Sequence, residues 1–184
     1  MYARYLSKKD PEKTKKYFDK AIGLDAKNIV AYTSDAVFYL SQKEFAKARM
    51  CCEKANAIKA NSVNNVLLFA IYDSLGETAL AAELMKKIVK YHNGNPIAAY
   101  GEISHLYFTF TMREKAEYYC KEALKLSPNE EEPHCILGII YYSQGQLHEA
   151  KNEYTKAIEL SNNKKYIKFS RKMINDIDKK NLRS

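Results

Sequence analysis

The 184-residue chain is 46% apolar, which is enough to bury the core of one elongated domain. Its six glycines and four prolines are few, which favours helices and argues against a β-rich fold. The net charge of +8 comes from the two ends of the chain: residues 1–27 carry 8 basic and 4 acidic side chains, and residues 164–184 carry 8 basic and 2 acidic ones. The residues in between carry 14 basic and 16 acidic side chains. This distribution excludes a uniformly cationic nucleic-acid-binding surface.

The first two predicted helices cover about residues 2–7 and from Pro11 to about Leu24. Asp10 before Pro11 is a helix-start signal, because aspartate caps free backbone amides and proline fits the first helical turn. The chain therefore begins inside a helix pair, either as the degenerate end of an array or as a fragment of a longer one. Ala3 and Leu6 would then be uncovered, and we expect self-association through this N-terminal edge.

Four complete helix pairs follow. Asn28, Asn61 and Asn95 precede first helices, and asparagine side chains accept hydrogen bonds from the free amides at a helix start. Asn93–Gly94–Asn95 is the plainest break in the chain. The predicted pairs are 29–41 with 44–59, 63–75 with 77–91, 97–111 with 113–126, and 132–144 with 147–160.

The last segment, residues 164–184, predicts an amphipathic helix with a basic face. Tyr166, Ser170, Met173 and Ile177 fall on one helical stripe, and lysines and arginines take most other positions. Such a helix would cover the last pair with its stripe and face water with its charges, the capping role that repeat arrays need. The competing hypothesis is that it anchors the chain to nucleic acid or an anionic membrane. With two aromatic residues available for base stacking, nucleic acid is not the expected partner.

A sequence pattern recurs through the helix pairs. Tyr5, Tyr39, Tyr72, Tyr107 and Tyr141 are spaced 34, 33, 35 and 34 residues apart. A small residue follows each tyrosine by nine positions and a larger one follows four positions later: Thr14/Phe18, Ala48/Cys52, Ala81/Met85, Ala116/Cys120 and Ala150/Tyr154. The small residue lets two helices approach, and the larger one fills the remaining space. This period predicts two-helix units that bury their apolar faces against their neighbours.

The best-preserved copy, His134-x-x-Leu137-Gly138-x-x-Tyr141 … Gly145 … Ala150-x-x-x-Tyr154-x-x-Ala157, resembles the tetratricopeptide repeat. The resemblance covers residues 1 to about 163 and implies an all-α fold, a right-handed superhelical solenoid of antiparallel helix pairs with a C-terminal capping helix. It divides the chain into a truncated repeat at 1–28, full repeats at 29–61, 62–96, 97–130 and 131–163, and the basic capping helix at 164–184. Three residues depart from the family pattern: Asp35 replaces a leucine, and Lys43 and Thr111 replace a turn glycine.

The resemblance also implies a function, that of a non-catalytic scaffold or adaptor holding a peptide or helix of a partner protein in a concave groove. The first helix of each pair would line this groove, with these residues at the matching positions: Val37, Leu40, Val66, Ala70, Gly101, His105, Phe108, Cys135, Ile139 and Tyr142. Because most of them are apolar, we expect a partner with apolar anchors, and weaker binding when Phe108 or Tyr142 is replaced by alanine. The competing interpretation is that these side chains pack against a neighbouring repeat or a terminal helix.

One class of partner is not expected. Tetratricopeptide co-chaperones that hold the C-terminal carboxylate of heat-shock proteins use lysine, asparagine and arginine in the groove. This chain has Thr33, Val37, Ala70, Ala98 and Glu102 at the corresponding positions. None of these side chains donates the charge-assisted hydrogen bonds that a carboxylate requires.

Other functional classes find little support in the sequence. The four histidines are scattered, no Gly-rich phosphate loop or nucleophile triad is present, and the four cysteines form no Cys-x-x-Cys pair, so we predict no catalysis, metal or cofactor. Buried free thiols favour a reducing compartment such as the cytoplasm, and no run approaches the roughly 18 apolar residues of a membrane span. A further hypothesis makes these repeats the sensor half of a transcription regulator.

Overall fold

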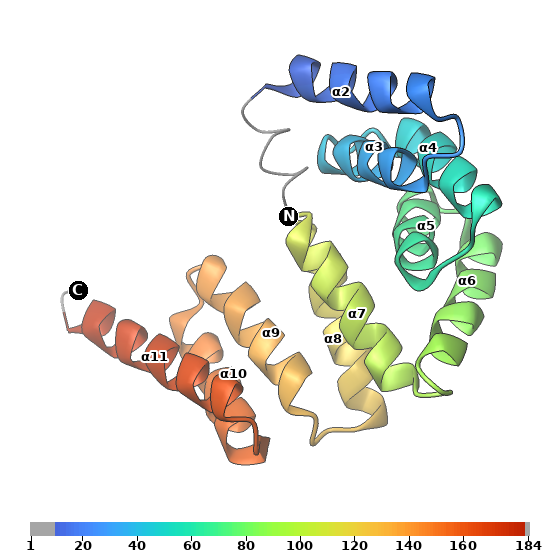
Figure 1. Cartoon of the computed structure of the whole chain (residues 1–184). Helices are drawn as coiled ribbons and strands as arrows, with labels where there is room; N and C mark the ends of the chain where they lie inside the picture. Colours follow the sequence, from blue (N-terminus) through green and yellow to red (C-terminus); the bar gives the residue numbers. More distant parts are fainter. Residues whose placement is uncertain (1–9, 183–184) are drawn as a thin grey trace. The chain divides into compact units, whose positions relative to one another are not determined.

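The computed structural model describes residues 10–182, and this part of the chain forms ten α-helices and no strands. The helices are α2 (Pro11–Leu24), α3 (Ile29–Ser41), α4 (Phe45–Ile58), α5 (Ser62–Leu75), α6 (Thr78–Tyr91), α7 (Pro96–Thr109), α8 (Arg113–Leu126), α9 (Glu131–Ser143), α10 (Leu147–Leu160) and α11 (Lys164–Asn181) (Figure 1). The all-α class is confirmed, and the paired helices begin and end within two residues of the predicted positions. The predicted helix over 2–7, Tyr5 and the edge residues Ala3 and Leu6 lie outside the described residues.

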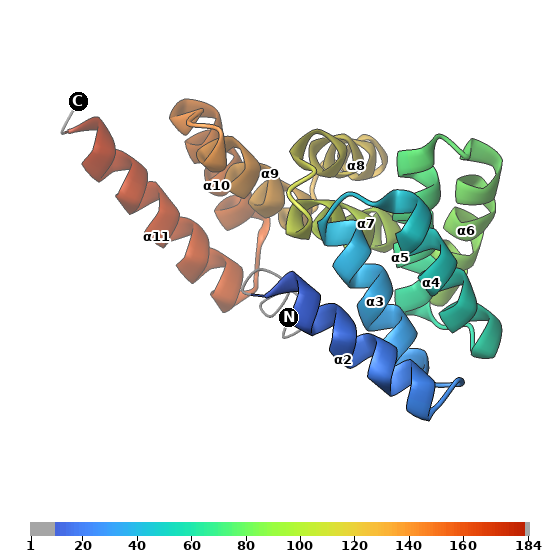
Figure 2. The same cartoon turned by 90° about the horizontal axis from the view of Figure 1, so that it is seen from above.

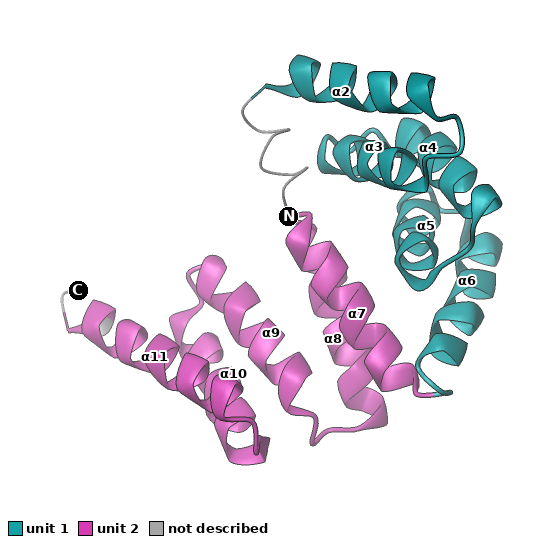
Figure 3. Cartoon of the chain, viewed as in Figure 1, with its two compact units in different colours: residues 1–94 teal, residues 95–184 magenta. Residues whose placement is uncertain are grey.

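The chain divides into two compact units, shown in Figure 3. Unit 1 runs to Gly94 and contains α2 to α6, and unit 2 begins at Asn95 and contains α7 to α11. Within unit 1, α3 pairs with α4 and α5 with α6, while α2 packs on α3 and α4 on α5. Within unit 2, α7 pairs with α8 and α9 with α10, and α11 runs beside α10 and α9 as the predicted cap (Figure 2).

Side-chain caps start the helices where the sequence predicts them. Asp10 accepts a hydrogen bond from the amide of Lys13 at 2.9 Å, and Asn28 accepts one from Ala31 at 2.9 Å. Asn61 and Asn95 cap α5 and α7 in the same way. Each cap satisfies an amide that has no partner inside its own helix.

The recurring small and large residues form the helix contacts. Ala48, Ala81, Ala116 and Ala150 are all buried at the second helix of their pair. Of the larger residues four positions on, Cys52, Cys120 and Tyr154 are buried and Met85 is partly buried. Phe18 of the first, incomplete pair is partly exposed. The sequence period therefore marks the close approach of neighbouring helices, as expected.

The recurring tyrosines mark the turn between the two helices of a pair. The amide of Glu44 donates to the carbonyl oxygen of Tyr39 at 2.9 Å, and the equivalent bond forms at Tyr72, Tyr107 and Tyr141. This bond requires a residue with positive φ just before the donor, and the four residues there are Lys43 (61°), Gly76 (77°), Thr111 (61°) and Gly145 (81°). Two of the four turns thus place a side chain where glycine is favoured.

We expect Thr111→Gly to raise the free energy of unfolding by about 1 kcal/mol, because a β-branched residue is strained at positive φ. Part of the gain is offset by the greater chain entropy of glycine in the unfolded state. Lys43→Gly, which removes an unbranched side chain at the same φ, should give a smaller gain. Urea unfolding followed by circular dichroism measures both, and a loss of stability in Thr111→Gly would contradict the assignment of strain to this turn.

Candidate partner-binding surfaces

The structure separates the predicted groove residues into buried and accessible ones. Five of the ten are buried: Leu40, Val66, Ala70, Gly101 and Cys135. Their side chains contribute to the packing of the first helices and offer no surface to a partner in this structure. The accessible set is therefore smaller than the periodicity alone indicates.

In unit 1 the accessible predicted position is Val37 on α3, a helix that contacts α5. Val37 is partly exposed, and Val30 and Val63 at the starts of the two helices are largely exposed. Thr33 is held by its neighbour, since its hydroxyl donates to Asn64 Oδ1 at 2.9 Å. This surface is apolar and lacks charged donors, as the sequence predicts.

In unit 2 the accessible positions are on α7. His105 is exposed and Phe108, three residues later on the same helix face, is partly exposed. Gly101 lies one turn before His105, where Glu132 of α9 comes close: a Cβ built on Gly101 would be 3.7 Å from Glu132 Oε2. His105 and Phe108 thus lie one turn apart on an accessible face of α7, which packs against α8 and α9.

The remaining two predicted positions, Ile139 and Tyr142, are partly exposed and partly covered by α11. Ile139 and Tyr142 pack against the buried cluster formed by Ala150, Tyr154 and Ile177. Lys180 also lies over the Tyr142 ring, with its Nζ 4.2 Å from the ring centroid. At these two residues the contacts are those of the competing interpretation, in which groove positions pack against a terminal helix.

Sequence reasoning missed a buried carboxylate in unit 1. Asp35 is buried between α2, α3 and α4, where Lys15 Nζ lies 3.4 Å from its Oδ2 and the Cys51 thiol donates to Oδ2 at 3.3 Å. It lines a hollow of about 270 Å³ together with Tyr32, Tyr39 and their neighbours. The replacement of the family's leucine by Asp35 was the sequence signal for an unusual site here. The spacing of the residues did not predict that Lys15 and Cys51 would lie beside Asp35.

The four cysteines are unpaired, and their environment keeps them protonated. Burial, followed by the charge of Asp35, raises the pKa of Cys51 to about 12. Burial likewise raises the pKa of Cys52 and Cys120 to about 12 and that of Cys135 to about 11. Because the thiolate is the reactive form, these raised pKa values lower the nucleophilicity of the four thiols at neutral pH.

His134 is buried, as expected for a residue at the large-ring position of the repeat. Sequence reasoning missed its partners: Nδ1 lies 2.5 Å from Glu153 Oε2, and Nε2 lies 3.1 Å from the carbonyl oxygen of Pro128. Glu153 also accepts a hydrogen bond from Lys156 at 3.1 Å. The arrangement joins α9 to α10 and uses both ring nitrogens.

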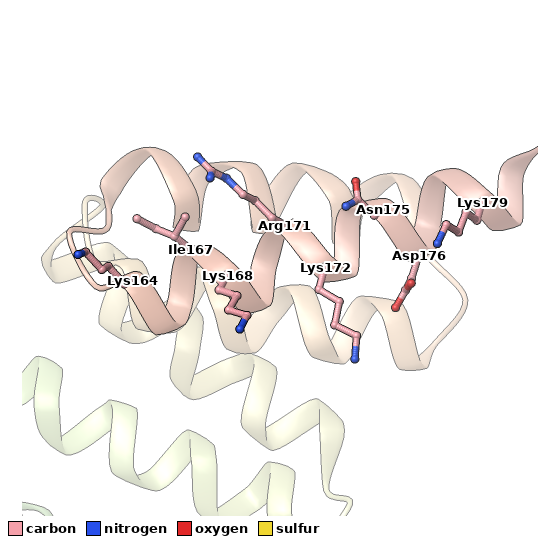
Figure 4. Close-up of a pocket in the computed structure, with 8 residues that line it drawn as sticks. All are labelled: Lys164, Ile167, Lys168, Arg171, Lys172, Asn175, Asp176 and Lys179. Carbon is pink, nitrogen blue, oxygen red and sulfur yellow. The ribbon is translucent and has the colours of Figure 1, made fainter.

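The exposed face of α11 is basic. Figure 4 shows eight side chains that project from this helix and line a shallow hollow of about 710 Å³: Lys164, Ile167, Lys168, Arg171, Lys172, Asn175, Asp176 and Lys179. At 100° per residue they lie opposite Tyr166, Ser170, Met173 and Ile177, the stripe predicted to pack. Ser170 and Ile177 are buried, which confirms the predicted orientation of the helix.

Residues 10–182 show neither a clustered metal site nor a candidate membrane span. No group of three or more histidine, cysteine, aspartate or glutamate side chains is placed there to hold a metal ion. None of the helices in that range combines the length and the hydropathy needed to span a bilayer.

Comparison with known proteins identifies the repeats. Tetratricopeptide repeat models match residues 5–28, 97–130 and 131–164, together half of the chain. A 47-residue segment is 47% identical to Stress-induced-phosphoprotein 1 of Caenorhabditis elegans, and it makes up 26% of this chain but 15% of that protein.

Solved structures of similar fold cover nearly the whole chain. YrrB, described as a TPR protein with an unusual peptide-binding site, aligns with a TM-score of 0.52 at 19% identity, covering 93% of this chain and 89% of that one. PilW, a type IV pilus biogenesis factor, gives 0.52 at 19% identity with 96% and 87% covered, and MamA gives 0.50 at 16% with 85% and 91%. At these identities the likeness shows the fold. The repeat matches, the helix pairs and the recurrent tyrosine turns together place this chain in the tetratricopeptide repeat family.

Proposed function

We propose that this chain is a non-catalytic protein-interaction scaffold and that a partner segment binds over His105 and Phe108 of α7. The general role rests on the family, whose repeats serve as protein-binding scaffolds. The observation that carries the finer assignment is that His105 is exposed and Phe108 partly exposed on α7, whereas Cys135 of α9 is buried and Ile139 and Tyr142 of α9 pack against the cluster that contains Ile177 of α11. The surface on α7 is therefore the predicted groove segment of unit 2 that stays open.

The chemistry of this surface favours a peptide with an apolar anchor. Phe108 offers a ring that gains contact area when a partner side chain covers it, and His105 offers a ring nitrogen for a hydrogen bond. A preformed helix loses little conformational entropy when a partner docks on it. An amphipathic helix or an extended peptide would both satisfy these groups.

The test is a selection of binding peptides from a random display library against the full chain, followed by affinity measurements with Phe108→Ala. We expect the variant to bind selected peptides about tenfold more weakly or worse, the usual effect of truncating an aromatic anchor. Its helicity should match that of the native chain, because Phe108 is partly exposed. Tyr142→Ala is the comparison: since Tyr142 packs with α11, it should lower stability and leave peptide affinity nearly unchanged. The reverse pattern would rule out α7 as the docking surface.

The groove positions on α3, α5 and α7 argue against a C-terminal carboxylate as the ligand. Of the five positions that would need cationic or amide donors, Ala70 is buried and Thr33 already donates its hydroxyl proton to Asn64. Val37 and Ala98 carry no polar group, and Glu102 would repel a carboxylate. We therefore propose a partner recognised through internal side chains.

A second candidate function, anchoring through α11 to a polyanion, is favoured by the exposed basic face shown in Figure 4. Deleting residues 164–184 would test it poorly, because Ile177 is buried against Tyr154 and its loss would open the core. Replacing Lys164, Lys168, Arg171 and Lys172 by glutamine removes charge from exposed positions only.

We expect this fourfold variant to elute from heparin at lower salt than the native chain, since each removed charge reduces the ion release that drives polyanion binding. If the scaffold assignment holds, the variant should bind the selected peptides as well as the native chain does. Loss of peptide binding together with heparin binding would instead favour α11 as the functional surface. Anionic vesicles and single-stranded oligonucleotides, run in parallel, distinguish a membrane from a nucleic acid.

A further inference from the structure

A third surface lies in unit 1, where α4, α5 and α6 enclose a hollow of about 510 Å³. Its lining comes from the end of α4 and the residues after it, the start of α5 and the end of α6: Asn56, Ala60, Asn65, Lys87, Lys90 and Tyr91. The volume is within the range of sites that bind small ligands or short peptide segments. None of the ten predicted groove residues lines it, so this hollow is separate from the surface on α7.

Two amide side chains at this hollow have unsatisfied acceptors. Asn65 is only 2% exposed, and its Oδ1 accepts no hydrogen bond from the described residues. Asn56 Oδ1, from the neighbouring helix, is buried and equally without a donor. A buried acceptor without a partner destabilises the fold, so two at one hollow call for an explanation. A ligand that supplies hydrogen-bond donors would satisfy both.

The rim of the hollow is cationic. Lys87 and Lys90 are exposed at the end of α6, and neither forms an ion pair with a described residue. No aspartate or glutamate lines the hollow. Tyr91 beside them is 51% exposed, which leaves much of a large ring uncovered at the same rim.

We infer that this hollow binds a short acidic peptide segment. Once the buried amide groups of Asn56 and Asn65 turn toward the hollow, backbone N–H groups of such a segment would donate to them, and its carboxylates would pair with Lys87 and Lys90. The Tyr91 ring would cover the aliphatic part of a bound glutamate. A phosphate or an isolated carboxylate offers acceptors alone and would leave both asparagine oxygens unpaired, so the peptide is the ligand that matches all the groups present.

The probe is N-acetyl tetraglutamate amide, titrated into the isotope-labelled full chain at low salt and followed by amide chemical shifts. We expect the largest shifts around Asn56, Asn65 and Tyr91. Lys87→Gln combined with Lys90→Gln should weaken binding about tenfold or more, because both carboxylate partners are lost. Lys86→Gln, an exposed lysine on α6 outside the hollow, is the matched control and should change affinity by less than about twofold.

Asn65→Leu separates amide recognition from charge, since it leaves every lysine in place and should still weaken tetraglutamate binding. If that variant loses helicity, the lysine pair decides the question, because both lysines are exposed and their replacement leaves the core intact. Three outcomes would each overturn the inference. They are equal tetraglutamate binding by the native chain and the lysine variant, chemical-shift changes confined to α11, and equally strong shift changes with inorganic phosphate. Phe108→Ala should bind tetraglutamate normally, so failure of the α7 assignment and failure of this one are distinguishable.

Discussion

Gly138→Ala is expected to lower the free energy of unfolding of the chain by about 2 kcal/mol, the size of effect seen when a packed core receives an extra methyl group. A Cβ built on Gly138 would lie 2.7 Å from Cδ1 and Cε1 of Tyr154 and 3.0 Å from its Cζ. Carbon atoms do not approach that closely without repulsion. Either the ring or the helix that carries Gly138 has to move.

The surroundings of Tyr154 oppose such a movement. Its side chain is fully buried, in a cluster with Ala150 and Ile177. The ring of Phe169 from α11 also meets it edge-on, with centroids 6.0 Å apart. Pushing the ring away from α9 would press it into the capping helix, and close-packed interiors transmit such strain instead of absorbing it.

Gly101→Ala is the control, because Gly101 lies on the preceding first helix, one turn before the position equivalent to Gly138, and is also buried. There a Cβ would meet Glu132 Oε2 at 3.7 Å, an ordinary contact. Alanine forms helix more readily than glycine, so this variant should gain about 0.5–1 kcal/mol. Urea unfolding of both variants checks the opposite signs. Equal effects would mean that helix propensity, not contact with Tyr154, decides both positions.

The close packing of small and large residues could be predicted from the sequence because the repeat supplies it five times over. The spacing of Tyr39, Tyr72, Tyr107 and Tyr141 located the turns, and the observed hydrogen bonds to their carbonyl oxygens explain why the spacing is regular. Asparagine caps located the helix starts. These features are local, so periodicity and capping rules suffice to find them.

The accessible part of the groove could not be predicted in the same way. Helical periodicity places Ile139 and Tyr142 on one face, but it cannot tell whether α11, which starts more than twenty residues later, returns to cover that face. The partners of Asp35 and the hollow at Asn65 arise from three helices meeting in space. Sequence spacing gave no signal for either, because the residues that meet are far apart along the chain.

His134→Ala is expected to lower the free energy of unfolding by about 3 kcal/mol at neutral pH, because it removes a hydrogen-bond partner of the largely buried Glu153 carboxylate. The ring also fills space between α9 and α10, so its loss opens a cavity. His148→Ala on the exposed face of α10 is the control and should have little effect. Similar losses in both variants would show that the contacts to Glu153 and Pro128 contribute nothing.

His134→Ala should also change how the free energy of unfolding responds to acid. Burial alone would raise the pKa of Glu153, but hydrogen bonds and positive charge from His134 and Lys156 outweigh it and lower that pKa below its usual 4.5. A carboxyl group with a lowered folded-state pKa adds stability that is complete above 4.5 and is lost as the pH falls through the folded value. Urea unfolding at about pH 6 and about pH 3.5 should therefore show a smaller drop for His134→Ala than for the native chain, since the variant has already lost the stronger of the two interactions. Parallel losses in the two proteins would mean that the acid sensitivity of the chain originates in other carboxylates.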